Sequence, residues 1–322
     1  MGEALDILYV IDPLDVLILE TETSLLLMEE VARRGHANHV ARVPDLHLRQ
    51  GEPMALARTI ALDFERRPFH RLGEVEDRRL RDFDLVMMRK DPPVDVPYHV
   101  ALAILARAGD GVPVLNDPRG LMVSNEKLLP LDVPGAAPPS IVTADPDVAA
   151  AFAREHEEVV VKPLNEFSGR GIHRLSSRGS SLDADAIGAL AAHEGRHVLV
   201  QRFLPEVAAG DKRIFVLAGE PLGWVNRVPR PGSFRANIHQ GASVEPTEPT
   251  DREREVIAAA APLLERRGLE LAGFDFIGGW LTEINVTSPS ALRQIDRVMG
   301  EELEGRVVDH MVARATGRAG GA

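Results

Sequence analysis

Residues 274–290 read FDFIGGWLTEINVTSPS, two strand-like runs on either side of a Gly-Gly pair. In the second run Glu283 and Asn285 lie two residues apart, so the period of a β-strand points both side chains to one face. Asp275 in the first run adds a second carboxylate. Such a set suits Mg²⁺, which takes few protein oxygens and completes its shell with water and phosphate. The stretch therefore predicts either a metal site on a β-hairpin or a hairpin on which Asp275 and Glu283 are solvated strand residues.

The length of the turn decides whether the two carboxylates can meet. A two-residue turn would pair Ile277 with Trp280 and would turn Asp275 away from Glu283. A three-residue loop would pair Ile277 with Leu281 and would set Asp275 opposite Glu283. The metal interpretation therefore predicts a three-residue loop, or another odd register that has the same effect.

The composition is that of a globular protein with more than one folded unit. The chain has 322 residues, 27% of them charged, and no apolar run near the roughly 18 residues of a membrane span. Its first residues, MGEALD, lack the features of a signal peptide. The absence of cysteine excludes disulfides, thiolate ligands and a cysteine nucleophile, and indicates a cytoplasmic location. The net charge of −12 argues against nucleic acid as a partner, and no membrane partner is expected.

The N-terminal third alternates strand and helix patterns. Leu5–Ile11 is typical of a buried strand, Thr21–Arg34 has apolar residues at helical spacing, and Asn38–Val43 returns to strand composition. This order predicts a βαβ unit in a parallel α/β sheet. Asp84–Met88 is expected as a further strand. The pattern predicts no element for residues 49–81, which are polar and poorly periodic.

The rest of the chain carries clear local signals. Asp145 suits the N-cap of a helix to His156, and Thr250 opens a capping box for a helix to Arg267. Further helices are expected over His99–Ala108, Pro118–Leu129, Ser290–Met299 and Glu301–Ala315, and further strands over Val112–Leu115, Val159–Pro163, His197–Phe203 and Lys212–Leu217.

Three stretches have side chains suited to anionic ligands. Lys162 ends a strand and precedes the small-residue loop 165–171, where a lysine and loop amides can hold a phosphate, although many strands end this way. Arg89 begins a charged cluster just past a strand, where open α/β sheets bind ligands. The segment 225–240 is expected as a loop whose arginines suit carboxylate or phosphate. Each stretch is also compatible with a solvated surface loop.

Several short motifs agree in order and spacing with one known family. They are Asp12-Pro13, MRKDPP at 88–93, NEKL at 125–128, KPL at 162–164, GDKR at 210–213 and LTEINVTSP at 281–289. Together they resemble the prokaryotic glutathione synthetases of the ATP-grasp superfamily over nearly the whole chain. The resemblance implies a mixed α/β and α+β chain with the ATP-grasp fold. It also implies an N-terminal Rossmann-like substrate domain (1–123), a lid subdomain (124–200) and a C-terminal subdomain with the metal and catalytic residues (201–322).

The resemblance also implies roles for individual residues. It implies two Mg²⁺ ions, replaceable by Mn²⁺, at Asp275, Glu283 and Asn285, in agreement with the hairpin. Arg213 and Arg235 would neutralise charge during catalysis. ATP is expected at Lys127, Lys162, Ser168, Gly169, Gly171, Gln201, Phe203, Leu204 and Asp211. Substrate contacts are expected at Arg89, Asn237, Ser288 and Ser290.

The implied reaction is the ATP-dependent joining of a carboxylate to an amine through an acyl phosphate, with γ-glutamylcysteine and glycine as small-molecule substrates. The implied assembly is a homo-oligomer, a tetramer in the relatives. Loops 165–171 and 235–241 carry bulkier side chains than the family pattern, which leaves the roles of Arg170 and His239 open. Two alternatives stay open: a ligase with another γ-glutamyl or peptide substrate, and a non-catalytic ATP-binding protein.

Overall fold

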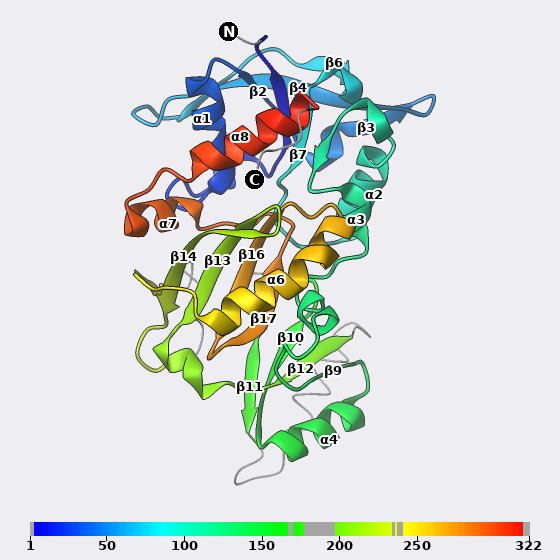
Figure 1. Cartoon of the computed structure of the whole chain (residues 1–322). Helices are drawn as coiled ribbons and strands as arrows, with labels where there is room; N and C mark the ends of the chain where they lie inside the picture. The colour runs from blue at the N-terminus through cyan, green and yellow to red at the C-terminus, as the bar shows by residue number, and fades with distance from the viewer. Residues whose placement is uncertain (1–2, 167–169, 177–196, 234–235, 237–240, 318–322) are drawn as a thin grey trace.

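Three β-sheets follow one another along the molecule (Figure 1). The computed structural model describes residues 3–166, 170–176, 197–233, 236 and 241–317. An eight-stranded sheet lies at the N-terminal end, a five-stranded sheet lies in the middle, and a four-stranded sheet lies at the other end. No helix in this described part of the chain is long and apolar enough to span a bilayer. The mixed α/β architecture predicted from the sequence is confirmed.

Four parallel strands form one side of the N-terminal sheet, in the order β2-β1-β7-β8, with β8 at the edge. Helix α1 (Thr23–Arg33) connects β1 to β2, which confirms the predicted βαβ unit. β1 and β7 are almost wholly buried, as expected for parallel strands covered by helices. The strand bounds are β1 Asp6–Val10, β2 Ala37–Ala41, β7 Leu85–Met88 and β8 Val114–Leu115.

Antiparallel strands extend this sheet through the segment for which the sequence pattern predicted no element. They are β3 Leu46–Arg49, β4 Glu52–Leu62, β5 His70–Leu72 and β6 Glu76–Arg79. β4 pairs with β2 and with the other three. Exposed side chains on these strands form ion pairs, such as Arg49 with Asp77 at 2.5 Å. Because one face of these strands carries charged side chains, their sequence has the polar composition that is typical of a loop.

Helices from both ends of the chain pack beside the N-terminal sheet. α2 (Val96–Leu105) and the short α3 (Pro118–Met122) contact each other, and α8 (Glu304–Ala315) packs against α1. Arg34 follows α1 and donates to the Asp309 carboxylate at 2.5 Å and to the Gly305 carbonyl at 2.8 Å. The last helix of the chain therefore lies against the first, as Figure 1 also shows.

The helix expected over Pro118–Leu129 is wrong in its second half. α3 ends at Met122, and the chain then enters a turn. Asn125 explains the break, because its Oδ1 accepts from the Lys127 backbone N at 3.1 Å. Its Nδ2 donates to the Leu164 carbonyl at 3.0 Å, which ties the turn to the four-stranded sheet.

The four-stranded sheet is antiparallel, in the order β11-β10-β12-β9. α4 (Pro146–His156) packs on it through a small core that contains Val159 and Val161. Asp145 caps α4 by accepting from the backbone of Asp147, which confirms the predicted N-cap. The strands are β9 Ser140–Thr143, β10 Glu158–Pro163, β11 His173–Ser176 and β12 Val198–Arg202.

The five-stranded sheet is also antiparallel, in the order β15-β14-β13-β16-β17. α6 (Asp251–Arg266) covers one face, and Thr250 forms the predicted capping box with Glu253. α7 (Leu292–Met299) packs against β14. The loop expected over 225–240 is wrong at its start, because β14 continues to Val228. The strands are β13 Asp211–Leu217, β14 Glu220–Val228, β15 Ser243–Glu245, β16 Leu271–Ile277 and β17 Trp280–Asn285.

Asn116 joins the N-terminal sheet to the five-stranded sheet. Its buried amide donates to the carbonyls of Leu271 at 2.8 Å and Val286 at 2.7 Å, and accepts from the Leu271 backbone N at 2.8 Å. A buried amide bonded in this way fixes where β16 begins and β17 ends relative to β8. The sequence-based domain division at residues 123 and 200 stays a prediction.

Candidate active site

The hairpin of β16 and β17 has an irregular register. Ile277 pairs with Trp280, so the turn has two residues and the predicted three-residue loop is wrong. Thr282 is then an extra residue in β17, a β-bulge, and the pairing beyond it sets Asp275 opposite Glu283. The predicted pairing of the two carboxylates is therefore confirmed, although a bulge and not the loop length produces it.

The bulge also separates Leu281 from Glu283, which would share a face in a regular strand. Leu281 is fully buried in the apolar cluster that contains Ile284, whereas Glu283 lines a cavity. Thr282 holds the bulge, because its Oγ1 donates to the Asp275 carbonyl at 3.1 Å. One inserted residue thus gives the sheet an apolar face towards α6 and a polar face towards the cavity.

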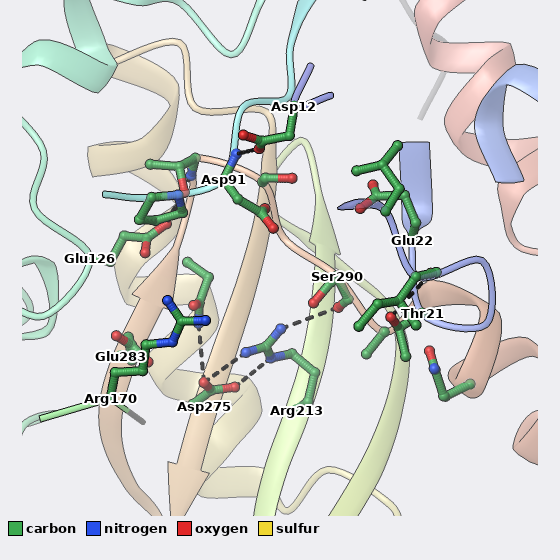
Figure 2. Close-up of a pocket in the computed structure, with 18 of the residues that line it drawn as sticks. Asp12, Thr21, Glu22, Asp91, Glu126, Arg170, Arg213, Asp275, Glu283 and Ser290 are labelled. Atoms are coloured by element: carbon green, nitrogen blue, oxygen red, sulfur yellow. Dashed lines mark hydrogen bonds and ion pairs between the residues drawn. The ribbon is translucent and has the colours of Figure 1, made fainter. Parts of the chain in front are cut away.

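The cavity has a volume of about 470 Å³ and lies between the N-terminal sheet and the five-stranded sheet (Figure 2). One wall comes from segments 12–22 and 91–92, and Arg170 reaches the cavity beside Glu283. The other wall carries five of the residues predicted for the metal and the substrates: Asp275, Glu283, Asn285, Ser288 and Ser290.

Two buried arginines hold Asp275. Arg213 donates from Nε to Oδ1 at 2.5 Å and from Nη2 to Oδ2 at 2.9 Å, and Arg227 reaches Oδ1 at 2.9 Å. Burial by itself raises the pKa of Asp275, but the two guanidiniums outweigh it and bring the pKa to about 2. Arg213 also donates to the Ser290 carbonyl at 3.2 Å, and Arg227 pairs with Asp211 at 2.8 Å. Asp275 is therefore fully ionised at neutral pH.

Two lysines approach from the neighbouring sheet and turn. Lys127 lies 3.4 Å from Glu283 Oε1 and donates to the Glu166 carbonyl. Lys162 lies one residue before the end of β10 and donates to Gln201 Oε1 on the paired strand β12 at 2.9 Å. Burial lowers the pKa of Lys162, and Glu283 opposes this effect. Positive charge is therefore concentrated locally in an acidic protein.

Glu126 fixes the chain that follows the hairpin. Its Oε1 accepts from the backbone N of Val286 at 2.8 Å, and from the backbone N and Oγ1 of Thr287 at 2.9 and 2.8 Å. Its backbone carbonyl accepts from Ile284 N at 2.9 Å. Burial raises the pKa of Glu126, with a further contribution from Glu283. The NEKL turn therefore orients the residues on either side of Asn285.

The polar end of the hairpin fits a hard divalent cation. Asn285 Nδ2 donates to Asp275 Oδ2 and to the Gly273 carbonyl, both at 3.1 Å, which leaves its Oδ1 as the ligating atom. In the described ranges no three His, Cys, Asp or Glu side chains converge, so the candidate set is two carboxylates and one amide. Mg²⁺ requires no larger set, because water and substrate phosphates supply its other ligands.

Some of the other predicted site residues lie in the described part of the chain, and some do not. Arg89 is buried and donates to Ser24 Oγ and to the Pro289 carbonyl, both at 3.0 Å, so it orients the loop before Ser290. Gly171 has φ 66° before β11, and Phe203 and Leu204 follow β12, with Leu204 buried. Five residues lie outside the described ranges: Ser168, Gly169, Arg235, Asn237 and His239.

Sequence reasoning missed several residues of the site. Glu126 was quoted within a motif but given no role, and Arg227 was expected in a loop although it lies on β14. Asp91 lines the cavity from within the charged cluster predicted after β7, although it was given no role of its own. Gln294 also lines the cavity and was not predicted, because it reaches the cavity only through the packing of separate elements.

Solved structures of ATP-grasp ligases share this architecture. The D-cycloserine synthetase DcsG superposes with a TM-score of 0.65 at 15% identity, over 95% of this chain and 99% of that one. The ligase PsnB in complex with Mg and ADP superposes with a TM-score of 0.62 at 19% identity, over 98% and 99% of the two chains. The fold and the site together define an ATP-dependent ligase of the ATP-grasp class.

Sequence relatives narrow the class further. Models of the prokaryotic glutathione synthetase N-terminal and ATP-grasp domains match residues 5–122 and 126–300. Proteins named glutathione synthetase from Gloeobacter violaceus and Parasynechococcus marenigrum are 41% and 40% identical, over 95% and 94% of this chain and 96% and 98% of theirs. The chain belongs to the prokaryotic glutathione synthetase family.

Proposed function

We propose that this protein is a glutathione synthetase, which joins the cysteinyl carboxylate of γ-glutamylcysteine to the amine of glycine and converts ATP to ADP and phosphate. One observation supports it above all. Arg213 contacts Asp275 and the Ser290 carbonyl at the end of the cavity where Glu283 and Asn285 also lie. Groups for phosphate, metal and substrate carboxylate therefore meet at one place.

ATP binds between the four-stranded and five-stranded sheets in this proposal. Lys127 and Lys162 approach Glu283 and Gln201 from the side of the four-stranded sheet, which suits contact with phosphates. The other nucleotide contacts are Ser168, Gly169, Gly171, Gln201, Phe203, Leu204 and Asp211.

Asp275, Glu283 and Asn285 hold Mg²⁺ in this proposal, two ions in all, and Mn²⁺ substitutes. Bound there, the metal neutralises charge on the phosphates. Asp275 is ionised at all working pH values because Arg213 and Arg227 stabilise its charge. Arg227 also holds Asp211, so the carboxylates remain fixed before any ligand arrives.

The reaction needs positioning and charge neutralisation but no side-chain nucleophile. An oxygen of the substrate carboxylate attacks the γ-phosphorus, ADP leaves, and the neutral amine then attacks the acyl carbon of the acyl phosphate. Inorganic phosphate leaves, and the amine loses its proton to give the amide. Arg213 and Arg235 stabilise the negative charge that develops. Arg89, Asn237, Ser288 and Ser290 position the substrates, Arg89 through the Pro289 carbonyl.

Product analysis across a substrate panel tests this proposal. Purified protein with ATP and Mg²⁺ is incubated with γ-glutamyl dipeptides and amines, and ADP, phosphate and peptide product are measured. The highest kcat/KM is expected for γ-glutamylcysteine with glycine. A higher value with another pair would instead identify a ligase of different specificity. No product with any pair, despite ATP binding, would identify a non-catalytic ATP-binding protein.

We also propose a cytoplasmic homo-oligomer, most simply a tetramer, with no nucleic acid or membrane partner. The net charge of −12 supports the absence of a nucleic acid partner. Light scattering of the purified protein gives the mass directly, and a monomeric mass at micromolar concentration would contradict the assembly.

A further inference from the structure

The cavity wall opposite Arg213 is acidic. Two of its carboxylates, Glu22 and Asp91, feel the charge of the buried Arg89 guanidinium but form no direct ion pair with it. Asp12 pairs with Lys90 at 3.0 Å and accepts from the Asp91 backbone N at 2.8 Å. Glu22 accepts from the Ser24 backbone N at 2.9 Å as the cap of α1, but neither Glu22 nor Asp91 forms an ion pair with any residue in the described ranges. Figure 2 shows Asp12, Asp91 and Glu22 across the cavity from Asp275 and Arg213.

Gln294 adds an independent sign of a missing ligand at this wall. The side chain is 9% exposed and lines the cavity. Its Nε2 donates to the Glu20 carbonyl at 2.9 Å, and because a carbonyl only accepts, the amide orientation is fixed. The other amide atom, Oε1, is buried without a hydrogen-bond partner among the described residues. Buried acceptors of this kind are normally satisfied, so the site lacks a donor.

We propose that Glu22, Asp91 and Gln294 Oε1 form a subsite for a primary ammonium group of the acyl substrate. Under the proposed function, on which this inference rests, that group is the α-ammonium of the γ-glutamyl residue. An ammonium offers three N–H donors and one positive charge, which matches two carboxylates and one amide oxygen. The subsite therefore recognises the end of the acyl substrate that is remote from the reacting carboxylate.

The charge distribution of the cavity supports this orientation. Arg213 and Arg227 lie at the wall of β13 and β14, where a substrate carboxylate reacts, and Glu22 and Asp91 lie at the other wall. Burial, with a contribution from Glu22, raises the pKa of Asp91 to about 7. That effect is expected of a buried carboxyl close to another carboxylate, and the charge of Arg89 opposes it only in part. This distribution favours an acyl substrate placed with its α-ammonium at the acidic wall and its reacting carboxylate at the wall of β13 and β14.

The test compares two acyl substrates that differ by one group. γ-Glutamylcysteine has the α-amino group, and glutarylcysteine lacks only that group. Wild-type protein is expected to show a kcat/KM at least about 100-fold lower for glutarylcysteine, because a charged hydrogen-bonded group is lost. The variants are Glu22→Gln, which keeps the α1 cap, and Gln294→Leu. Asp15→Asn removes an exposed carboxylate from the same loop and serves as the matched control.

Each variant is expected to raise KM for γ-glutamylcysteine about 10- to 100-fold while changing kcat and the KM for glycine less than about 3-fold. Kinetics with glutarylcysteine should not change, and Asp15→Asn should behave as wild type. An equal loss for both acyl substrates, or a higher KM for glycine in place of the dipeptide, would overturn the ammonium subsite. If wild-type protein turns over neither acyl substrate, the proposed function itself fails. In that case calorimetry of γ-glutamylcysteine binding to wild type and Glu22→Gln decides on the subsite: weaker binding to the variant supports it, and equal or absent binding refutes it.

Discussion

Asp275 faces Glu283 across the hairpin because Thr282 is an extra residue in β17. The pairing of Ile277 with Trp280 would otherwise set Asp275 opposite Thr282. The Thr282 hydroxyl bonds the Asp275 carbonyl at 3.1 Å and so links the backbone of the bulge to the strand that carries the other carboxylate. The spacing of the candidate metal ligands is thus controlled by a residue that does not touch the cavity.

Thr282→Val is expected to affect the Mg²⁺ dependence of activity more than the stability of the fold. The substitution keeps the shape but leaves the buried Asp275 carbonyl without its hydroxyl donor, which costs about 1–2 kcal/mol in unfolding free energy. The Mg²⁺ concentration for half-maximal activity should rise several-fold, because the bulge relaxes. Urea unfolding and a Mg²⁺ titration of activity measure the two effects. An unchanged Mg²⁺ dependence would show that the bulge does not control the ligand spacing.

Glu283→Gln is expected to remove activity while leaving the fold intact. Glu283 is partly exposed and has one long contact to Lys127, so its charge contributes about 0.5 kcal/mol or less to stability. As a metal ligand it is needed for turnover, and kcat should fall by about 100-fold or more. Glu245→Gln, at an exposed position of β15 in the same sheet, is the control and should retain activity. Full activity of Glu283→Gln would refute the metal assignment.

Asp275→Asn is expected to lose stability as well as activity. The substitution leaves Arg213 and Arg227 buried and facing a neutral amide, which costs about 3–5 kcal/mol. The pKa of Asp275 is lowered to about 2, so its stabilisation is present above its unfolded value of 3.8 and is lost as pH falls through about 2. The difference in unfolding free energy between wild type and variant should therefore be full at pH 7 and shrink below pH 4. A difference under about 1 kcal/mol at pH 7 would contradict the buried ion-pair cluster.

The apparent KM for the acyl substrate is expected to fall as pH rises through about 7. Burial raises the pKa of Asp91 to about 7, with Glu22 and Asp12 raising it further and Arg89 and Ser288 opposing. Ionised Asp91 binds an ammonium better, so KM should decrease a few-fold between pH 6 and 8. The unligated protein should lose stability as pH rises from about 4 to about 7, because over that range Asp91 is protonated in the native state and ionised in the unfolded state.

The pH profile of Asp91→Asn supplies the check. The amide keeps the size of the side chain but does not titrate, so the step near pH 7 should disappear while activity remains measurable. A step that persists unchanged in Asp91→Asn would assign it to another group.

Local order along the chain was readable from the sequence. The apolar run at Leu5–Ile11, the cap at Asp145 and the capping box at Thr250 each act within a few residues, and the structure confirms them. The prediction of an element failed where a side chain competed with the backbone for hydrogen bonds, as Asn125 does after α3. It also failed where charged side chains covered one face of the strands, as on β3 to β6. Short-range pattern cannot show either effect.

The sequence by itself determined which oxygen and guanidinium groups this protein carries and in which order, because strand period and motif spacing are properties of the chain. Only the tertiary structure decided where they meet. The bulge at Thr282 turned Glu283 towards the cavity, and the partnering of Arg227 with Asp275 required β14 to extend to Val228. Gln294, whose Oε1 has no hydrogen-bond partner among the described residues, came to lie at the acidic wall through α7. These relationships depend on contacts between residues far apart in sequence, whose geometry is set by packing and not by local pattern.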